Sequence, residues 1–88
     1  MVTRDVVIVN QLGLHARAAA RFVRLASQYA ATVRVAKGAR ELDGKSILGL
    51  LLLGAARGTT IVIRTEGSDA EAAADALAAL VAEGFGES

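Results

Sequence analysis

A single histidine is the residue in this sequence best suited to do chemistry. His15 lies in the run Gly13-Leu14-His15-Ala16-Arg17, where a glycine ends one apolar segment and a helical pattern begins. The first turn of a helix has backbone N–H groups without internal partners and a partial positive charge, so it attracts anions. A neutral imidazole is a nucleophile near neutral pH. A histidine at a helix start therefore predicts covalent transfer of an anionic group, such as a phosphoryl group.

The residues directly after His15 supply the complementary charge. The guanidinium of Arg17 can reach back to phosphoryl oxygens, and the backbone N–H groups of Ala16 and Arg17 are expected to bind the same oxygens. A bond from phosphorus to an imidazole nitrogen is labile, because protonated imidazole is a good leaving group. This chemistry suits a reversible relay better than a permanent mark.

Composition argues against several other classes of protein. The chain has no cysteine and one histidine, which excludes a thiolate or multi-histidine metal site, and we expect neither a metal nor a cofactor. It has no P-loop and no acidic pair beside a second histidine. Ten basic residues against nine acidic ones give no net field for binding nucleic acid.

The apolar segments are too short for a membrane protein. The first, residues 6–9, ends at Asn10 and is far shorter than a secretory signal requires. The longest, residues 47–56, is about half of the roughly 20 residues that a spanning helix needs, and it contains Gly49 and Gly54. We therefore expect a cytoplasmic protein without membrane insertion.

The hydrophobic pattern predicts an alternation of strands and helices. Period-two alternation indicates strands, and apolar positions three and four apart indicate helices. In chain order the pattern gives a strand over 3–9, a helix over 16–29, strands over 32–37 and around 41–42, a helix over 47–53, a strand over 59–65 and a last helix from about 70 to 84.

This order of elements, βαββαβα, predicts an α+β fold. We expect a two-layer open-faced sandwich, with three helices on one face of a four-stranded, mostly antiparallel sheet. The run Ser68-Asp69-Ala70-Glu71 is a capping box that opens the last helix. Residues 1–88 are expected to form one domain, with the tail over residues 85–88 loosely ordered.

Ser46 and the apolar residues after it form a second candidate site. Ser46 is placed to cap the helix over residues 47–53, and the same hydroxyl can be a phosphorylation site; both can hold. A helix of two turns cannot bury every side, so we expect Leu48 and Leu52 to be exposed as a docking patch. Ordinary core packing is expected for Ile47, Leu50 and Leu51.

Two further arginines, Arg21 and Arg24, share a helix face with Arg17. One interpretation is a solvated face of the helix. The other is a surface that meets acidic groups on a partner protein and assists encounter.

Two segments of this sequence resemble one known family. The run Asn10-Gln11-Leu12-Gly13-Leu14-His15-Ala16-Arg17-Ala18-Ala19 is similar to the phosphorylation-site signature of the HPr family, the histidine phosphocarriers of the phosphoenolpyruvate-dependent phosphotransferase system. The run Asp43-Gly44-Lys45-Ser46-Ile47-Leu48 resembles the family's second segment, which carries a regulatory serine. Chain length and element order agree with the family over nearly the whole chain.

The resemblance implies specific roles and partners. Enzyme I would donate the phosphoryl group of phosphoenolpyruvate to Nδ1 of His15, with Arg17 as its charge partner, and enzyme IIA domains would receive it. A serine kinase acting on Ser46 would control the carrier. We expect partners to dock on Arg21, Arg24, Ile47 and Leu48, and the resemblance agrees for Leu48.

The residue after Arg17 separates two branches of the family. Many members of the sugar branch have proline there, whereas this chain has Ala18, which helix geometry tolerates. The run of three alanines that begins at Ala18 is similar to the nitrogen-related branch, and both branches stay open. In either branch we expect a monomer.

Three other functions remain open from the residues alone. The chain could be a regulatory interaction module controlled by phosphorylation of Ser46 rather than a relay. An enzyme with His15 as general base would need a substrate pocket and further catalytic groups. A purely structural module would tolerate His15→Ala without loss of function, whereas a carrier would not.

Overall fold

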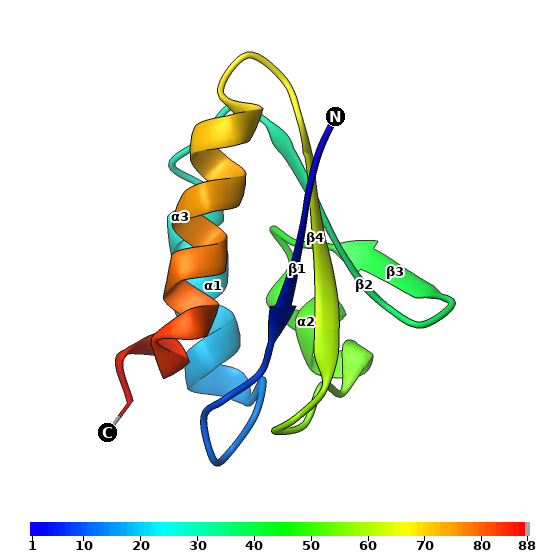
Figure 1. Cartoon of the computed structure of the whole chain (residues 1–88), viewed down its shortest axis with the longest axis vertical. Coiled ribbons are helices and arrows are strands. Elements are labelled where there is room, and N and C mark those ends of the chain that lie inside the picture. The colour runs from blue at the N-terminus through cyan, green and yellow to red at the C-terminus, as the bar shows by residue number, and fades with distance from the viewer. Residues whose placement is uncertain (88) are drawn as a thin grey trace.

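The computed structural model describes residues 1–87 and consists of one antiparallel sheet covered by helices (Figure 1). The strands lie in the order β1-β4-β2-β3, and every neighbouring pair is antiparallel. Along the chain the elements are β1 (Val2–Val7), α1 (Ala16–Ala26), β2 (Thr32–Lys37), β3 (Arg40–Asp43), α2 (Ile47–Leu53), β4 (Thr60–Glu66), α3 (Ala70–Ala82) and a short 3-10 helix (Gly84–Gly86). This architecture confirms the predicted α+β open-faced sandwich.

The two layers meet in a large hydrophobic core, beside which Ala31, Ala70 and Ala73 form a second, smaller cluster. The alternating strands β2 and β4 turn Val33, Val35, Ile61 and Ile63 inward, and all four are essentially inaccessible to solvent. Each helix adds large side chains to the same cluster, namely Phe22 from α1, Leu50 and Leu53 from α2, and Leu77 and Val81 from α3. Figure 1 shows α1 and α3 side by side against the sheet.

Helix α1 ends earlier than the apolar pattern predicts. The pattern extends to Tyr29, but the helix stops at Ala26. The N–H groups of Gln28 and Tyr29 bond to carbonyls only three residues back. The N–H groups of Ala30 and Ala31 then donate to the carboxylate of Asp69, each at 2.8 Å. A tertiary contact therefore binds the backbone directly after the position where the predicted helix would have ended.

The predicted capping box at the start of α3 is wrong in detail. Asp69, not Ser68, occupies the N-cap, and its side chain makes no capping hydrogen bond within the helix. Its carboxylate accepts instead from the chain entering β2, and these hydrogen bonds, first that from Ala30, lower the pKa of the carboxyl group. Asp69 thus joins the start of α3 to the start of β2.

Helix α2 is short, apolar and fixed at both ends. The Ser46 hydroxyl accepts a hydrogen bond from the N–H of Gly49 at 3.0 Å, which confirms the predicted N-cap. Gly54 ends the helix in the left-handed conformation, and the Lys37 ammonium donates to the carbonyls of Leu53 and Gly54. Within residues 1–87, no helix is long and apolar enough to cross a membrane.

The expectation for which α2 side chains face the core is partly wrong. Leu50 and Leu53, three residues apart, point inward, while Ile47 and Leu51 keep 43% and 39% of their surface exposed. Only one side of the helix packs against the rest of the molecule, and Ile47 and Leu51 lie at the edges of that side. Leu48 and Leu52 are exposed as predicted. We call the exposed side chains Ile47, Leu48, Leu51 and Leu52 the α2 patch.

Candidate functional site

The candidate site is built on the turn between β1 and α1. Gly13 adopts φ +67, and a Cβ atom there would lie 2.7 Å from the carbonyl oxygen of Ala55. The next residue, Leu14, donates its N–H to that same carbonyl at 2.9 Å. Only glycine fits this close approach, which presses the turn against the loop that follows α2. The next residue along the chain, His15, is thereby held at the start of α1.

His15 is the N-cap of α1, as the sequence predicts. Its backbone is extended, and its Nδ1 accepts a hydrogen bond from the N–H of Arg17 at 3.3 Å. A nitrogen that accepts a hydrogen bond carries a lone pair and no hydrogen, so the proton of the neutral ring resides on Nε2. The structure therefore directs an unprotonated Nδ1 toward the N-terminal end of the helix.

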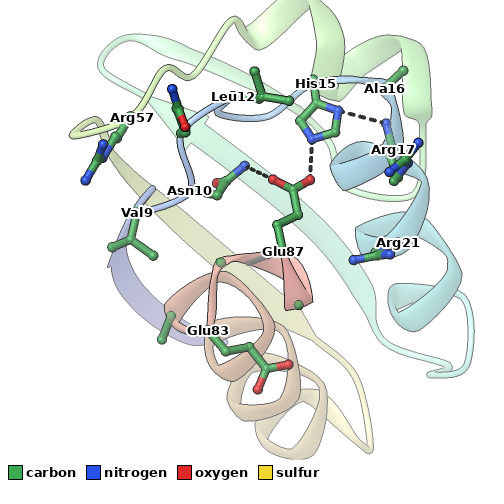
Figure 2. A pocket seen from close by; sticks show the side chains of 14 residues that line it. Val9, Asn10, Leu12, His15, Ala16, Arg17, Arg21, Arg57, Glu83 and Glu87 are labelled. Atoms are coloured by element: carbon green, nitrogen blue, oxygen red, sulfur yellow. Dashed lines mark hydrogen bonds and ion pairs between the residues drawn. The ribbon is translucent and has the colours of Figure 1, made fainter.

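The other ring nitrogen contacts a carboxylate from the C-terminal end of the chain. Nε2 of His15 pairs with Oε2 of Glu87, and Oε1 of Glu87 accepts from the side-chain amide of Asn10 at 3.0 Å (Figure 2). The same amide donates to the carbonyl of Gly13 at 2.7 Å. The hydrogen bonds from His15 first, and from Asn10 second, lower the pKa of the Glu87 carboxyl group. Glu87 thus orients the imidazole ring.

Glu87 is a site residue that the sequence analysis missed. The tail was expected to be loosely ordered, which is wrong for residues 85–87; Ser88 lies outside the described residues. Phe85 is completely buried, and the Arg21 guanidinium donates to its carbonyl. A signal was present, because Phe85 is one of only two phenylalanines and is flanked by glycines. An aromatic side chain between flexible residues favours an anchored segment over a free tail.

Three arginines line an open hollow beside His15. Arg17 and Arg21 come from α1, and Arg57 comes from the loop before β4. The sequence analysis predicted Arg17 here and missed Arg57. Arg21 was assigned to partner docking, yet its guanidinium also binds the tail within the chain. These three arginines outnumber the two glutamates that line the same hollow, Glu83 and Glu87, and their excess positive charge suits an anionic group at Nδ1.

The remaining predicted residues, Arg24, Ser46, Ile47 and Leu48, do not line this hollow. Arg24 is exposed on α1, in its last turn. The α2 patch lies on the helix that contacts α1, and Leu12, which lines the hollow, is 70% exposed. Clustered exposed apolar side chains favour a protein-docking surface. Among residues 1–87, no cluster of three or more metal-ligating side chains is present.

Comparison with known proteins assigns the chain first to a class and then to a family. A crystal structure of HPr-C-His from Thermoanaerobacter tengcongensis superposes with a TM-score of 0.96 and 39% identity, covering 100% of this chain and 99% of that one. The family model described as the PTS HPr component phosphorylation site matches residues 2–83. The family match identifies the class of protein as a phosphocarrier. The chain belongs to the HPr family of the phosphotransferase system.

Curated relatives carry two names within this family. The phosphocarrier protein HPr of Cupriavidus necator is 45% identical over 87 residues, covering 99% of this chain and 98% of that protein. The phosphocarrier protein NPr of Shewanella violacea is 45% identical over 84 residues, covering 96% of this chain and 92% of that protein. The chain is thus equally similar in identity to these two carriers, one named HPr and the other NPr.

Proposed function

We propose that this protein accepts a phosphoryl group from phosphorylated enzyme I on Nδ1 of His15 and passes it to an enzyme IIA domain. It acts as a stoichiometric, monomeric carrier in the cytoplasm. One observation carries the proposal: the unprotonated Nδ1 accepts from the Arg17 N–H at the positive end of α1, and Nε2 pairs with Glu87. A nucleophile with one defined tautomer at an anion-attracting helix end suits phosphoryl acceptance.

The residues around His15 have separate roles in this proposal. As the bond from Nδ1 to phosphorus forms, the bond from phosphorus to the donor breaks and its electron pair leaves with the donor. The backbone N–H of Arg17, which donates to Nδ1 before transfer, turns with that of Ala16 to the phosphoryl oxygens. The guanidinium of Arg17 balances their charge, with Arg21 and Arg57 at the wall of the same hollow.

We assign the docking of enzyme I and of the enzyme IIA domain to one surface of the protein. The α2 patch supplies apolar contact through Ile47 and Leu48, and Arg17, Arg21 and Arg24 meet acidic groups on the partner. Use of one surface by donor and acceptor fits a carrier, because the same reactive atom must face each of them in turn.

The experiment that tests the relay is an intact-mass measurement. The protein is incubated with phosphoenolpyruvate and its cognate enzyme I, and half of the sample is treated briefly with acid. A single phosphoryl adduct that acid removes, and that an added enzyme IIA domain also removes, is expected. Absence of an adduct with the cognate enzyme I would sink the proposal and leave a regulatory or scaffolding role.

Leu48→Ala is expected to slow phosphoryl acceptance from enzyme I about tenfold, because a central apolar anchor of an interface is lost. Leu48 is 66% exposed, so its own stability contribution is small. Single-turnover kinetics measures the effect. Val7→Ala is the matched control, since Val7 is 45% exposed on the outer face of the sheet. If both variants accepted the phosphoryl group at the same rate, the α2 patch would not be part of the docking surface.

A second function, control by a serine kinase, rests on the position of Ser46. Its hydroxyl caps α2, the helix that carries the α2 patch. A phosphate there would place negative charge directly beside Ile47 and Leu48 and oppose docking.

Two substitutions of Ser46 separate the capping role from the regulatory role. Ser46→Ala is expected to lower the free energy of unfolding by about 1 kcal/mol and to leave phosphoryl acceptance unchanged. Ser46→Asp retains a capping oxygen but adds charge, so we expect normal stability with slower acceptance. Urea denaturation and single-turnover kinetics measure the two effects. If Ser46→Asp accepts the phosphoryl group at the wild-type rate, the regulatory role is wrong.

A further inference from the structure

The contact between Glu87 and His15 brings a residue from late in the chain to the reactive imidazole ring. The residues are 72 positions apart, and both side chains are largely buried, with exposures of 25% for His15 and 19% for Glu87. Both carboxylate oxygens have a partner, because Oε2 pairs with Nε2 and Oε1 accepts from Asn10. A carboxylate bound at two points holds a fixed orientation, as a positioning residue must.

The tail contains its own anchor for this carboxylate. Phe85 is fully buried and adopts φ +59, a conformation that non-glycine residues seldom take. Its carbonyl accepts from Arg21, and the N–H of Glu87 bonds to the carbonyl of Gly84 at 3.0 Å. Core burial, an arginine and a backbone turn therefore fix the position from which Glu87 reaches the ring.

We propose that Glu87 is a positioning residue that keeps the proton on Nε2 of His15, so that the ring gives up its phosphoryl group readily. The inference rests on the proposed function. When Nδ1 takes up the phosphoryl group, the Nε2 proton stays in place and the ring becomes a phosphorylated imidazolium ion paired with the Glu87 carboxylate. No proton has to move in that step.

The reverse step explains why the retained proton matters. When the bond from Nδ1 to phosphorus breaks, its electron pair returns to Nδ1, and a ring that still carries the Nε2 proton leaves as neutral imidazole. A ring without that proton would leave as an anion, which is a far poorer leaving group. By favouring the protonated ring, Glu87 shortens the lifetime of the phosphoryl group and speeds its onward transfer.

Several charged groups besides Glu87 face the ring and the hollow. Arg17 and Arg21 from α1 and Arg57 from the loop before β4 oppose retention of a proton. Glu83, at the end of α3, lines the same hollow, but its carboxylate points away from His15 (Figure 2). Glu87 alone among the acidic residues lining this hollow contacts the ring, so its effect should not be shared by Glu83.

The test compares Glu87→Gln with Glu83→Gln, which removes the same charge from the same hollow. Each protein is phosphorylated with phosphoenolpyruvate and enzyme I, and loss of the adduct is followed by intact mass from pH 5 to pH 10. The rate of phosphoryl loss should fall as the pH rises and the ring loses its Nε2 proton. For Glu87→Gln we expect the midpoint of this fall to lie about one pH unit lower than in the wild type. At pH values above the midpoint, phosphoryl loss should be about tenfold slower than in the wild type. Glu83→Gln should follow the wild type.

A second readout does not depend on phosphoryl transfer. The ring 15N chemical shifts of unphosphorylated His15 should show the Nε2–H tautomer in the wild type and a mixture of tautomers in Glu87→Gln. An unchanged pH profile, or faster phosphoryl loss in Glu87→Gln, would overturn the inference. Failure of the wild type to form any adduct would instead count against the proposed function, so the two failures are distinguishable.

Discussion

His15→Ala is expected to abolish the acid-labile phosphoryl adduct completely, rather than to reduce it. The imidazole Nδ1 is the nucleophile in the proposed relay, and His15 is the only histidine in the chain. Arg17, the other nitrogen-bearing side chain at the start of α1, keeps its guanidinium protonated and is therefore not a nucleophile. Intact mass after incubation with phosphoenolpyruvate and enzyme I measures the loss directly.

His15→Asn is the control that keeps the structure intact. His15 also caps α1, so alanine would cost stability, whereas asparagine is a good N-cap residue and has no nucleophilic ring nitrogen. We expect His15→Asn to melt close to the wild type and to form no adduct. An adduct on either variant would move the acceptor to another residue and refute the assignment of His15.

Phe85→Ala is expected to lower the free energy of unfolding by about 3 kcal/mol, because it removes a fully buried aromatic side chain from the core cluster. In a domain of this size the loss corresponds to a fall of roughly 15 °C in Tm. Urea denaturation and thermal denaturation measure it. The same variant should release Glu87 from His15, because Phe85 anchors the tail.

Leu12→Ala is the matched control for this effect. Leu12 is a large apolar residue at the same end of the molecule, but it is 70% exposed, so its truncation should change stability by about 0.5 kcal/mol or less. If Phe85→Ala cost no more than Leu12→Ala, the tail would not be part of the core. Glu87 would then lack the fixed position that the further inference requires.

Local patterns predicted most elements of the fold correctly. Val33, Val35, Ile61 and Ile63 alternate with more exposed residues, and that alternation alone identified β2, β4 and their inward faces. The short helix α2 was predicted with both its ends, because Ser46 and Gly54 satisfy helix ends through local geometry. Predictions failed where a distant residue intervened, as when Asp69 bound the backbone of Ala30 and Ala31.

Some features of the candidate site also follow from local sequence, and others depend on distant residues. The sequence by itself determined that a histidine begins a helix beside an arginine, since glycine, helix start and spacing are all local properties. Only the tertiary structure decided what the other ring nitrogen contacts, because Glu87 reaches Nε2 from 72 residues away. It also brought Arg57 to the hollow and Arg21 to the tail. Such contacts depend on how the packed layers place distant segments, and no local pattern of residues encodes that placement.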